Sequence, residues 1–310
     1  MMKISVVIPT RNNSHRFATP LKTLLQQTLA PTDYEVIVVD NGSTDETPQI
    51  LARLSEQAPQ LRWVTEPIPG KSSARNRGIR EAQGELIIFI DDDILVEGDH
   101  LEKHQRYHLE ASQAVAVLGA VIDISPMEPG WLQDYFQARQ WLSSPQTRVK
   151  PGWAYVATDT LSVKRETLEQ VKMRSGSMPT YFDLDFKMRQ DGELGFRLHQ
   201  IGVKFIFAND IICRHNHPRN LQAMVNRSYG IGYATAQFIK KHPETKPILE
   251  EPHLPTAPLA KLALAILLLL LVIPTFLLRP LWIEPSRKVI GLFLQYHRIR
   301  GYQAGLRQLR

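Results

Sequence analysis

Short runs of β-branched and other apolar residues, each followed by a polar loop, recur through the N-terminal part of the chain. They occupy residues 3–9 (KISVVIP), 35–40 (EVIVVD) and 86–90 (LIIFI). Runs of this kind are typical of strands buried on both faces of a parallel sheet. Residues 21–29 and 50–54 lie between them and place leucine and isoleucine at helical spacing. The alternation predicts right-handed βαβ units and an α/β fold with a mostly parallel sheet.

Three carboxylates, Asp91, Asp92 and Asp93, follow the strand predicted over residues 86–90. In open α/β sheets, ligands bind beyond the carboxyl ends of the strands. Adjacent carboxylates repel one another, and a hard divalent cation removes that penalty. Because side chains alternate along an extended strand, we expect Asp91 and Asp93 to face one way and to share one metal ion. The alternative is a solvated acidic turn.

Two further segments suit a nucleotide. Asp40 ends another predicted strand and is placed to accept hydrogen bonds from a base or ribose, although an aspartate that opens an Asn-Gly turn is often only a turn residue. Residues 70–78 (GKSSARNRG) open a predicted helix with cations that suit a diphosphate. This segment lacks the spacing of a P-loop, and a solvated basic helix start is the alternative.

Composition and charge narrow the classes of protein. With 310 residues and 43% hydrophobic content, the chain has room for one large domain and an appendage. Residues 284–310 supply +5 of the net charge of +6, which argues against a nucleic-acid groove and for a basic segment near an anionic membrane surface. The single cysteine, Cys213, cannot form an internal disulfide, and the apolar run at residues 4–8 is too short for a secretory signal. We therefore expect the body of the protein in the cytoplasm.

The order of the motifs resembles that of the family 2 glycosyltransferases, which have the GT-A fold. The resemblance covers residues 3–243. The segments that carry it are VVIPTRNN at 6–13, VVDNGSTD at 38–45, GKSSARNRG at 70–78, GELIIFIDDD at 84–93 and DGELGFRLHQIG at 191–202. Five motifs in the right order are far more specific than any one of them.

The resemblance implies one nucleotide-binding domain with a mostly parallel central sheet and flanking helices, a nucleotide-sugar donor, a divalent cation (Mn²⁺ or Mg²⁺) at the D-x-D motif, and inversion at the anomeric carbon. It assigns the base to Asp40, the ribose to Asp91 and the metal-bridged diphosphate to Asp93. The residues expected to bind the donor nucleotide are Pro9, Thr10, Arg11, Asp40, Lys71, Arg75, Asp91 and Asp92. The expected metal ligands are Asp93, Asp91 and His215.

The last motif implies the catalytic base. By position Asp191 is the general base of an inverting transfer and Glu193 the fallback. Gln190 stands where the family usually has a glutamate. Both acids could instead favour the dipole of a helix N-terminus. An acceptor contact from Asp159, where the family often has Gly or Asn, has no support from the sequence.

His215 and His217 alternate in an extended segment, and the resemblance ranks His215 first as a metal ligand, with surface histidines as the alternative. The segment 100–108 is expected to be a polar helix whose histidines, His104 and His108 among them, lie at the surface. The aromatic residues of the segment 126–153 are expected in the core or at a membrane interface. They are Trp131, Tyr135, Phe136, Trp141 and Trp153.

The expected division is a catalytic domain over residues 1–245, a Pro-rich linker over 246–260 and a hydrophobic, basic tail over 261–310 with membrane-associated helices. The apolar run at 262–278 is short of the roughly 20 residues that span a bilayer. A single span would also put the basic tail outside, against the positive-inside rule. We therefore expect an in-plane or re-entrant segment, with a second apolar group on the same surface. That group consists of Ile290, Leu292, Phe293 and Leu294.

Together these features predict a membrane-associated, metal-dependent, inverting glycosyltransferase on the cytoplasmic face of the membrane. Its donor would be a UDP-, GDP- or dTDP-sugar, its acceptor a glycan or lipid-linked molecule of the cell surface, and nucleic acid is not expected as a partner. The Gln-x-x-Arg-Trp motif of processive members is absent from residues 1–310, which argues against a polymerising synthase. The alternatives are a non-catalytic nucleotide-sugar-binding or scaffold protein and a sugar nucleotidyltransferase.

Overall fold

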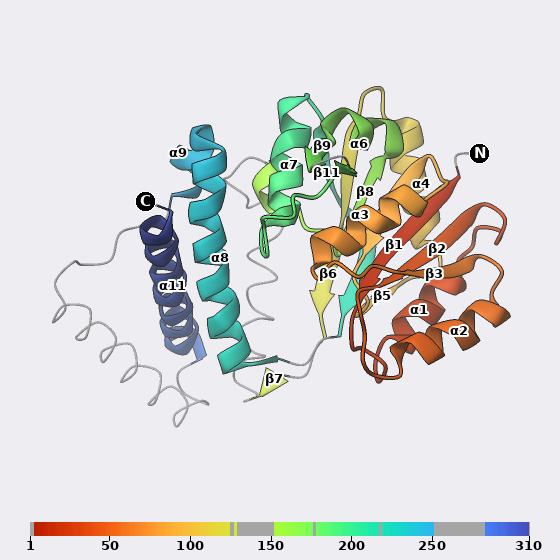
Figure 1. Ribbon diagram of the computed structural model, residues 1–310, viewed down its shortest axis with the longest axis horizontal. Helices are drawn as coiled ribbons and strands as arrows, with labels where there is room; N and C mark the ends of the chain where they lie inside the picture. Colours follow the sequence, from red (N-terminus) through yellow and green to blue (C-terminus); the bar gives the residue numbers. More distant parts are fainter. Residues whose placement is uncertain are drawn as a thin grey trace, which may run out of the picture. The chain divides into compact units, whose positions relative to one another are not determined.

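A computed structural model describes residues 3–124, 127–128, 152–175, 178–216, 219–250 and 283–309 (Figure 1). The predictions for the apolar run at 262–278, for His217 and for Trp131, Tyr135, Phe136 and Trp141 lie outside the described residues. The chain divides into two compact units. The first contains Met1–Ile124 and Pro145–Asn216, and the second contains Ser125–Ser144 and His217–Arg310.

An eight-stranded mixed sheet forms the centre of the first unit. Its strands, in spatial order, are β3 (Leu61–Thr65), β2 (Tyr34–Asp40), β1 (Ile4–Thr10), β4 (Leu86–Ile90), β8 (Thr160–Lys164), β6 (Val115–Asp123), β11 (Lys204–His215) and β5 (Ile94–Val96). The pairs β3–β2, β2–β1, β1–β4 and β6–β11 are parallel. Strand β8 runs antiparallel to both β4 and β6, and β5 runs antiparallel to β11. The prediction of a mostly parallel α/β sheet is therefore confirmed.

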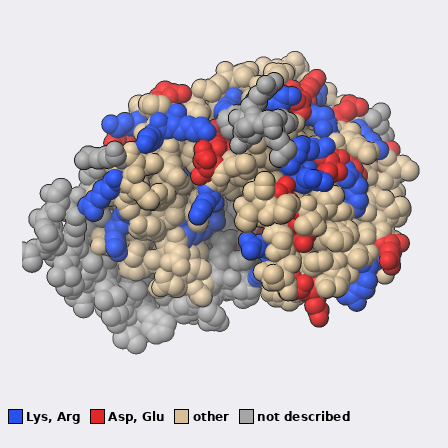
Figure 2. Space-filling model, in the orientation of Figure 1, with Lys and Arg blue, Asp and Glu red and all other residues tan. Residues whose placement is uncertain are grey.

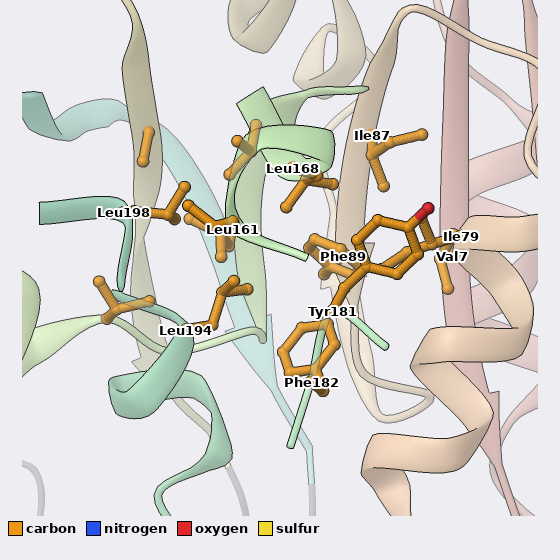
Figure 3. Close-up of a cluster of buried hydrophobic side chains, with 14 of the residues drawn as sticks. Val7, Ile79, Ile87, Phe89, Leu161, Leu168, Tyr181, Phe182, Leu194 and Leu198 are labelled. Atoms are coloured by element: carbon orange, nitrogen blue, oxygen red, sulfur yellow. The ribbon is translucent and has the colours of Figure 1, made fainter. Parts of the chain in front are cut away.

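Helices cover both faces of this sheet, because successive side chains of a strand point to opposite sides. Val6 and Ile8 belong to a cluster with α1 (Ala18–Leu25), α2 (Thr47–Gln57) and α4 (His100–Glu110). Val7, Ile87 and Phe89 belong to the cluster on the other face (Figure 3). The second cluster includes side chains from α3 (Lys71–Glu81), α6 (Arg165–Val171) and α7 (Gln190–Gln200). Strands buried on both faces explain the unbroken apolar runs of the sequence.

The short elements of the first unit complete this second layer. They are the 3-10 helix η2 (Gly152–Tyr155) and the two-stranded sheet of β9 (Met173–Ser175) and β10 (Met178–Thr180). Trp153 of η2 is 1% exposed, and its ring meets that of Phe196 edge-on at a centroid distance of 5.0 Å. Trp153 is thus a core residue, which was one of the two expected placements.

Two long helices, α8 (Leu221–Lys241) and α11 (Ile283–Gln308), pack together in the second unit. Their backbones touch at Gly232 and Gly301, where an added Cβ atom would overlap the carbonyl oxygens of Arg298 and Tyr229. The unit also contains β7 (Met127–Glu128) paired with β12 (Arg219–Asn220), η3 (Pro243–Thr245) and α9 (Lys246–Leu249). Helix α8 thus groups with the C-terminal helix in this unit, and the functional division expected at 245 and 260 stays a prediction.

The apolar residues expected together on a membrane surface do not share one face of α11. Ile290 and Leu294 are buried against Met224 of α8, whereas Leu292 is 52% exposed. Positions four apart lie on one side of a helix, and position 292 lies on another. That expectation was wrong for Ile290 and Leu294. None of the helices among the described residues combines the length and the apolar character that crossing a membrane requires.

The histidines of α4 are buried, contrary to the expectation of a surface helix. His100, His104 and His108 recur every four residues and so lie on one face, which packs against the sheet. The hydroxyl oxygen of Ser162 lies 2.8 Å from His104 Nδ1 and 2.9 Å from His108 Nε2. Burial lowers the pKa of His100 to about 3 and that of His108 to about 4, and it holds the pKa of His104 well below its usual value.

We expect the stability of the fold to decrease as the pH falls from 7.5 to 5. The unfolded chain protonates its histidines near pH 6.5, whereas the folded chain does not protonate these three until a lower pH, so proton uptake favours unfolding. The midpoint of urea unfolding, followed by circular dichroism, measures the effect. His104→Gln should reduce the pH dependence, and His15→Gln at an exposed histidine should leave it unchanged. Equal pH dependence of the unfolding midpoint in all three proteins would contradict the assignment of the effect to the buried histidines.

Candidate functional site

The carboxyl ends of β1, β2 and β4 meet at one edge of the sheet, because the three strands are parallel neighbours. The loops that follow them are tied together. The carbonyl oxygen of Thr10 accepts a hydrogen bond from the backbone N–H of Asn41 at 2.9 Å, and the hydroxyl of Thr10 donates to Asp92 Oδ2 at 2.6 Å. Pro9 is buried in β1, whereas Arg11 is exposed at the edge. The loops after β1, β2 and β4 therefore lie together at this edge of the sheet.

Asp40 is buried at the end of β2 and caps the loop that follows it. Its Oδ1 accepts a hydrogen bond from the backbone N–H of Ser43 at 3.1 Å, across Gly42, which has a φ of 73°. This is the turn role that the sequence left open as an alternative. The contact to a base or ribose stays a prediction.

The three adjacent aspartates do not extend the strand, and each side chain has a different partner. Strand β4 ends at Ile90, and a turn follows in which the N–H of Ile94 donates to the carbonyl oxygen of Asp91 at 3.2 Å. Asp91 meets Lys71 and Arg75, Asp92 meets Thr10, and Asp93 meets His215. The extended strand that the expected alternation of Asp91 and Asp93 relied on therefore ends at Ile90, and their sharing of one metal ion stays a prediction.

Asp91 holds two cations from the first turns of α3. Its Oδ2 lies 2.9 Å from Lys71 Nζ and its Oδ1 lies 2.7 Å from Arg75 Nη2. Burial alone would raise the pKa of Asp91, but the charges of Lys71 and Arg75 outweigh it and the pKa is lowered. The carboxylate of Asp91 raises the pKa of Lys71 in turn. Both residues are therefore charged at neutral pH.

Arg75 is almost fully buried, at 2% exposure, and its guanidinium lies 5.5 Å from the centre of the Phe182 ring. Only Nη2 contacts Asp91, while Nε and Nη1 are buried without a hydrogen-bond partner among the described residues. Unsatisfied charged donors are costly inside a protein. Together with the N-terminus of α3 beside them, they suit an anionic ligand such as a phosphate.

Helix α7 places Asp191 and Glu193 in different surroundings. Asp191 is half-buried, and its Oδ1 accepts from the N–H of Gly192 at 2.8 Å. Glu193 is fully buried, and Arg197 donates to both of its oxygens at 2.8 to 3.0 Å. The carboxylate of Glu193 is buried and paired with a cation of its own helix, so it cannot reach a substrate. This geometry does not fit the fallback role of Glu193 as a base and leaves Asp191 as the candidate.

Asp159 is the site residue that sequence reasoning missed. The ladder between β4 and β8 ends with Ile90 opposite Thr160, so Asp91 and Asp159 flank the end of that ladder. Burial, together with the charges of Asp91 and Asp191, raises the pKa of Asp159 to about 6, and His215 lowers it in part. Because their charges act on the pKa of Asp159, Asp91, Asp191 and His215 lie on its side of the sheet edge. The only signal that could have revealed Asp159 was the antiparallel direction of β8, which the sequence does not state.

Asp93 and His215 are the pair that fits a cation. His215 Nε2 lies 3.2 Å from Asp93 Oδ1, and both side chains are largely buried. Carboxylate oxygen suits Mn²⁺ and Mg²⁺, whereas the imidazole nitrogen favours Mn²⁺ because Mg²⁺ prefers oxygen ligands. No three His, Cys, Asp or Glu side chains within the described part of the chain form a ready-made metal cluster. The expected ligand set with Asp91 stays a prediction.

A model of the family "Glycosyl transferase family 2" matches residues 5–172. The chain belongs to this family. Its curated relatives include validoxylamine A glucosyltransferase from Streptomyces hygroscopicus subsp. limoneus, 28% identical over 79% of this chain and 58% of the relative. Poly(ribitol-phosphate) beta-N-acetylglucosaminyltransferase TarS from Staphylococcus aureus is 36% identical over 33% of this chain and 18% of the relative. This chain therefore spans little more than half the length of the first relative.

Solved structures share the fold. The mannosyltransferase PcManGT from Pyrobaculum calidifontis, in complex with GDP-Man and Mn²⁺, matches with a TM-score of 0.67 at 22% identity, over 100% of this chain and 88% of that one. TarS residues 1–349 from S. aureus, in complex with UDP-GlcNAc, match with a TM-score of 0.52 at 16% identity, over 100% and 92%. At this level of identity the likeness concerns the GT-A fold alone.

We expect Asp91→Asn to lower the free energy of unfolding by about 3 kcal/mol, because it leaves the buried guanidinium of Arg75 without a counter-charge. Urea unfolding measures the change. The matched control is Asp210→Asn, since Asp210 forms an exposed pair with Arg106. That change should cost less than about 1 kcal/mol. Similar losses of unfolding free energy in the two variants would show that burial of the Asp91–Arg75 pair adds nothing to stability.

Proposed function

We propose that the protein is a nucleotide-sugar-dependent, inverting glycosyltransferase with Asp191 as its general base. The observation that carries the proposal is the gathering of Lys71, Arg75, Asp91, Asp159 and Asp191 at the carboxyl edge of one sheet. Cations for a diphosphate would thus lie at the same edge as a half-buried carboxylate for a hydroxyl. Membership of the family supports the same reaction.

The donor would lie over the ends of β1, β2 and β4. Asp40 and Thr10 line that edge for the nucleoside, with Pro9 holding the strand end and Arg11 exposed beside it. Lys71 and Arg75 would meet the diphosphate, because their positive charges stand at the N-terminus of α3 and Arg75 has donors to spare. The donor named for PcManGT is GDP-Man and that for TarS is UDP-GlcNAc. A UDP-, GDP- or dTDP-sugar is therefore the proposed donor.

Asp93 and His215 would hold a divalent cation, and PcManGT was solved with Mn²⁺. When bound, such a cation neutralises negative charge on the departing diphosphate. The chain's own cations would act on the same charge, since Lys71 and Arg75 both lie beside Asp91. Asp91 forms ion pairs with both cations and so holds them in place.

The base must accept a proton from the acceptor hydroxyl while that oxygen attacks the anomeric carbon. Asp191 is suited to this role because it is half-buried and no cation among the described residues forms an ion pair with its carboxylate. Burial and the charges of Asp91 and Asp191 raise the pKa of Asp159 to about 6, so this side of the site is acidic. A charge-neutral acceptor alcohol, as in a glycan, matches this acidic side of the site.

We further propose that the enzyme works at the cytoplasmic face of a membrane on a glycan or lipid-linked acceptor of the cell surface. Exposed basic side chains on α8, α9 and α11 support this placement, since they would be attracted to anionic lipid (Figure 2). They are Arg227, Lys240, Lys241, Lys246, Arg300 and Arg307. Sedimentation with anionic and with neutral vesicles tests the placement, and equal binding to both would count against it.

The reaction class is tested by incubating the purified protein with UDP-, GDP- and dTDP-sugars in the presence of Mn²⁺ or Mg²⁺. Release of a nucleoside diphosphate supports the proposal. Release of pyrophosphate would identify a nucleotidyltransferase instead. Nucleotide binding without turnover of any donor would favour a binding or scaffold protein.

We expect Asp191→Asn to lower kcat by about 10²- to 10⁴-fold with little change in KM for the donor, because the amide cannot accept the proton. Steady-state release of nucleoside diphosphate measures it. Asp185→Asn is the matched control, an exposed aspartate shortly before the same helix, and it should keep wild-type activity. Wild-type kcat in Asp191→Asn would remove this residue as the base.

A further inference from the structure

His215 lies in a row of three side chains on neighbouring strands. Strand β11 pairs in parallel with β6, which sets His215 opposite Asp123, and antiparallel with β5, which sets it opposite Ile94, the neighbour of Asp93. Two backbone hydrogen bonds hold the row. The N–H of Ile124 donates to the carbonyl oxygen of His215 at 3.0 Å, and the N–H of Asn216 donates to that of Asp93 at 3.0 Å.

The imidazole ring of His215 stands between two carboxylates. Nε2 lies 3.2 Å from Asp93 Oδ1, and Nδ1 lies 3.6 Å from Asp123 Oδ2, within ion-pair range. The three side chains are 12% to 14% exposed, so bulk water does little to screen them. One carboxylate therefore lies near each nitrogen of the same ring.

A neutral imidazole carries one N–H and one lone pair. If Nδ1 carries the proton, the N–H points at Asp123, and the lone pair of Nε2 points toward Asp93. Two electron-rich atoms 3.2 Å apart then face each other, and a cation beside them relieves that repulsion. Metal-binding histidines commonly give their other N–H to a carboxylate in this way.

We propose that Asp123 is a positioning residue, which holds His215 as the Nδ1–H tautomer and so turns its Nε2 lone pair toward Asp93 for a divalent cation. Asp123 itself does not contact the cation, because the ring stands between them. The inference deepens the proposed function, since it rests on the metal dependence of that reaction. It assigns a role to the end of β6, which no motif of the sequence marked.

The first experiment measures Mn²⁺ affinity from the electron paramagnetic resonance signal of free Mn²⁺, with GDP or UDP present. Asp123→Asn should raise the Kd for Mn²⁺ by about 10- to 100-fold. His215→Ala should raise it by at least as much. The double variant should match His215→Ala within about twofold, because Asp123 acts only through the ring. Asp210→Asn, which removes a carboxylate from the same strand at an exposed position, is the control and should leave Kd unchanged.

An unchanged Kd in Asp123→Asn would overturn the inference. So would a double variant in which the two losses multiply, because Asp123 would then act on the cation independently of His215. Loss of affinity in the Asp210→Asn control to the same extent would point to net charge as the cause and would also overturn it.

The second experiment needs no metal and no activity. Nitrogen-15 spectra of the histidine-labelled protein report which ring nitrogen is protonated, and His215→Ala identifies the signal. Wild-type protein should hold a larger fraction of the Nδ1–H tautomer than Asp123→Asn, in which the population should shift toward Nε2–H. An unchanged tautomer in Asp123→Asn would overturn the positioning role. If wild-type protein bound no Mn²⁺ while the tautomer shifted as expected, the metal dependence would fail and the role of Asp123 would stand.

Discussion

The ion pair between Asp91 and the buried guanidinium of Arg75 is the constraint on which the rest of the site depends. A charged group at 2% exposure is stable only with a counter-charge, so the end of β4 and the first turns of α3 must stay together. Lys71 stands four residues earlier, on the same side of the helix, and reaches the same carboxylate. One aspartate thus gathers two cations where the dipole of α3 is positive. The arrangement is prepared for an anion before any ligand arrives.

The pairing of Asp91 with these cations is one part of how three adjacent carboxylates are accommodated. The turn after Ile90 separates them, and each finds a different counterpart: two cations for Asp91, a hydroxyl for Asp92 and an imidazole for Asp93. Burial and the two neighbouring charges raise the pKa of Asp92, which marks it as the carboxylate least compensated by cations. Asp91 thus pairs with the cations of α3, whereas Asp93 lies beside the imidazole of His215.

The sequence predicted the parts of this molecule that follow from periodicity. Strands β1, β2 and β4, the helices between them and the meeting of Asp40 and Asp91 at one edge all follow from apolar runs and parallel βαβ units. What it could not supply depends on tertiary pairing. The antiparallel course of β8 brings Asp159 to Asp91, and the approach of α11 to α8 at Gly232 buries Ile290. The turn after Ile90 likewise leaves no periodic signal in the sequence. The alternation of side chains expected along a strand therefore does not apply to the three aspartates.

The buried histidines of α4 show why the site can hold so much charge at one edge. His104 lies within hydrogen-bonding distance of Ser162 and 3.3 Å from the hydroxyl of Thr160, the residue directly after Asp159. Burial keeps His100, His104 and His108 neutral, so α4 supports β8 through hydrogen bonds and adds no charge beneath it. A lysine or arginine there would pair with the carboxylates from below and weaken their hold on ligands. Because the buried histidines carry no charge, the cations of α3 and the carboxylates near β4, β8 and α7 are left to interact with a ligand at this edge of the sheet.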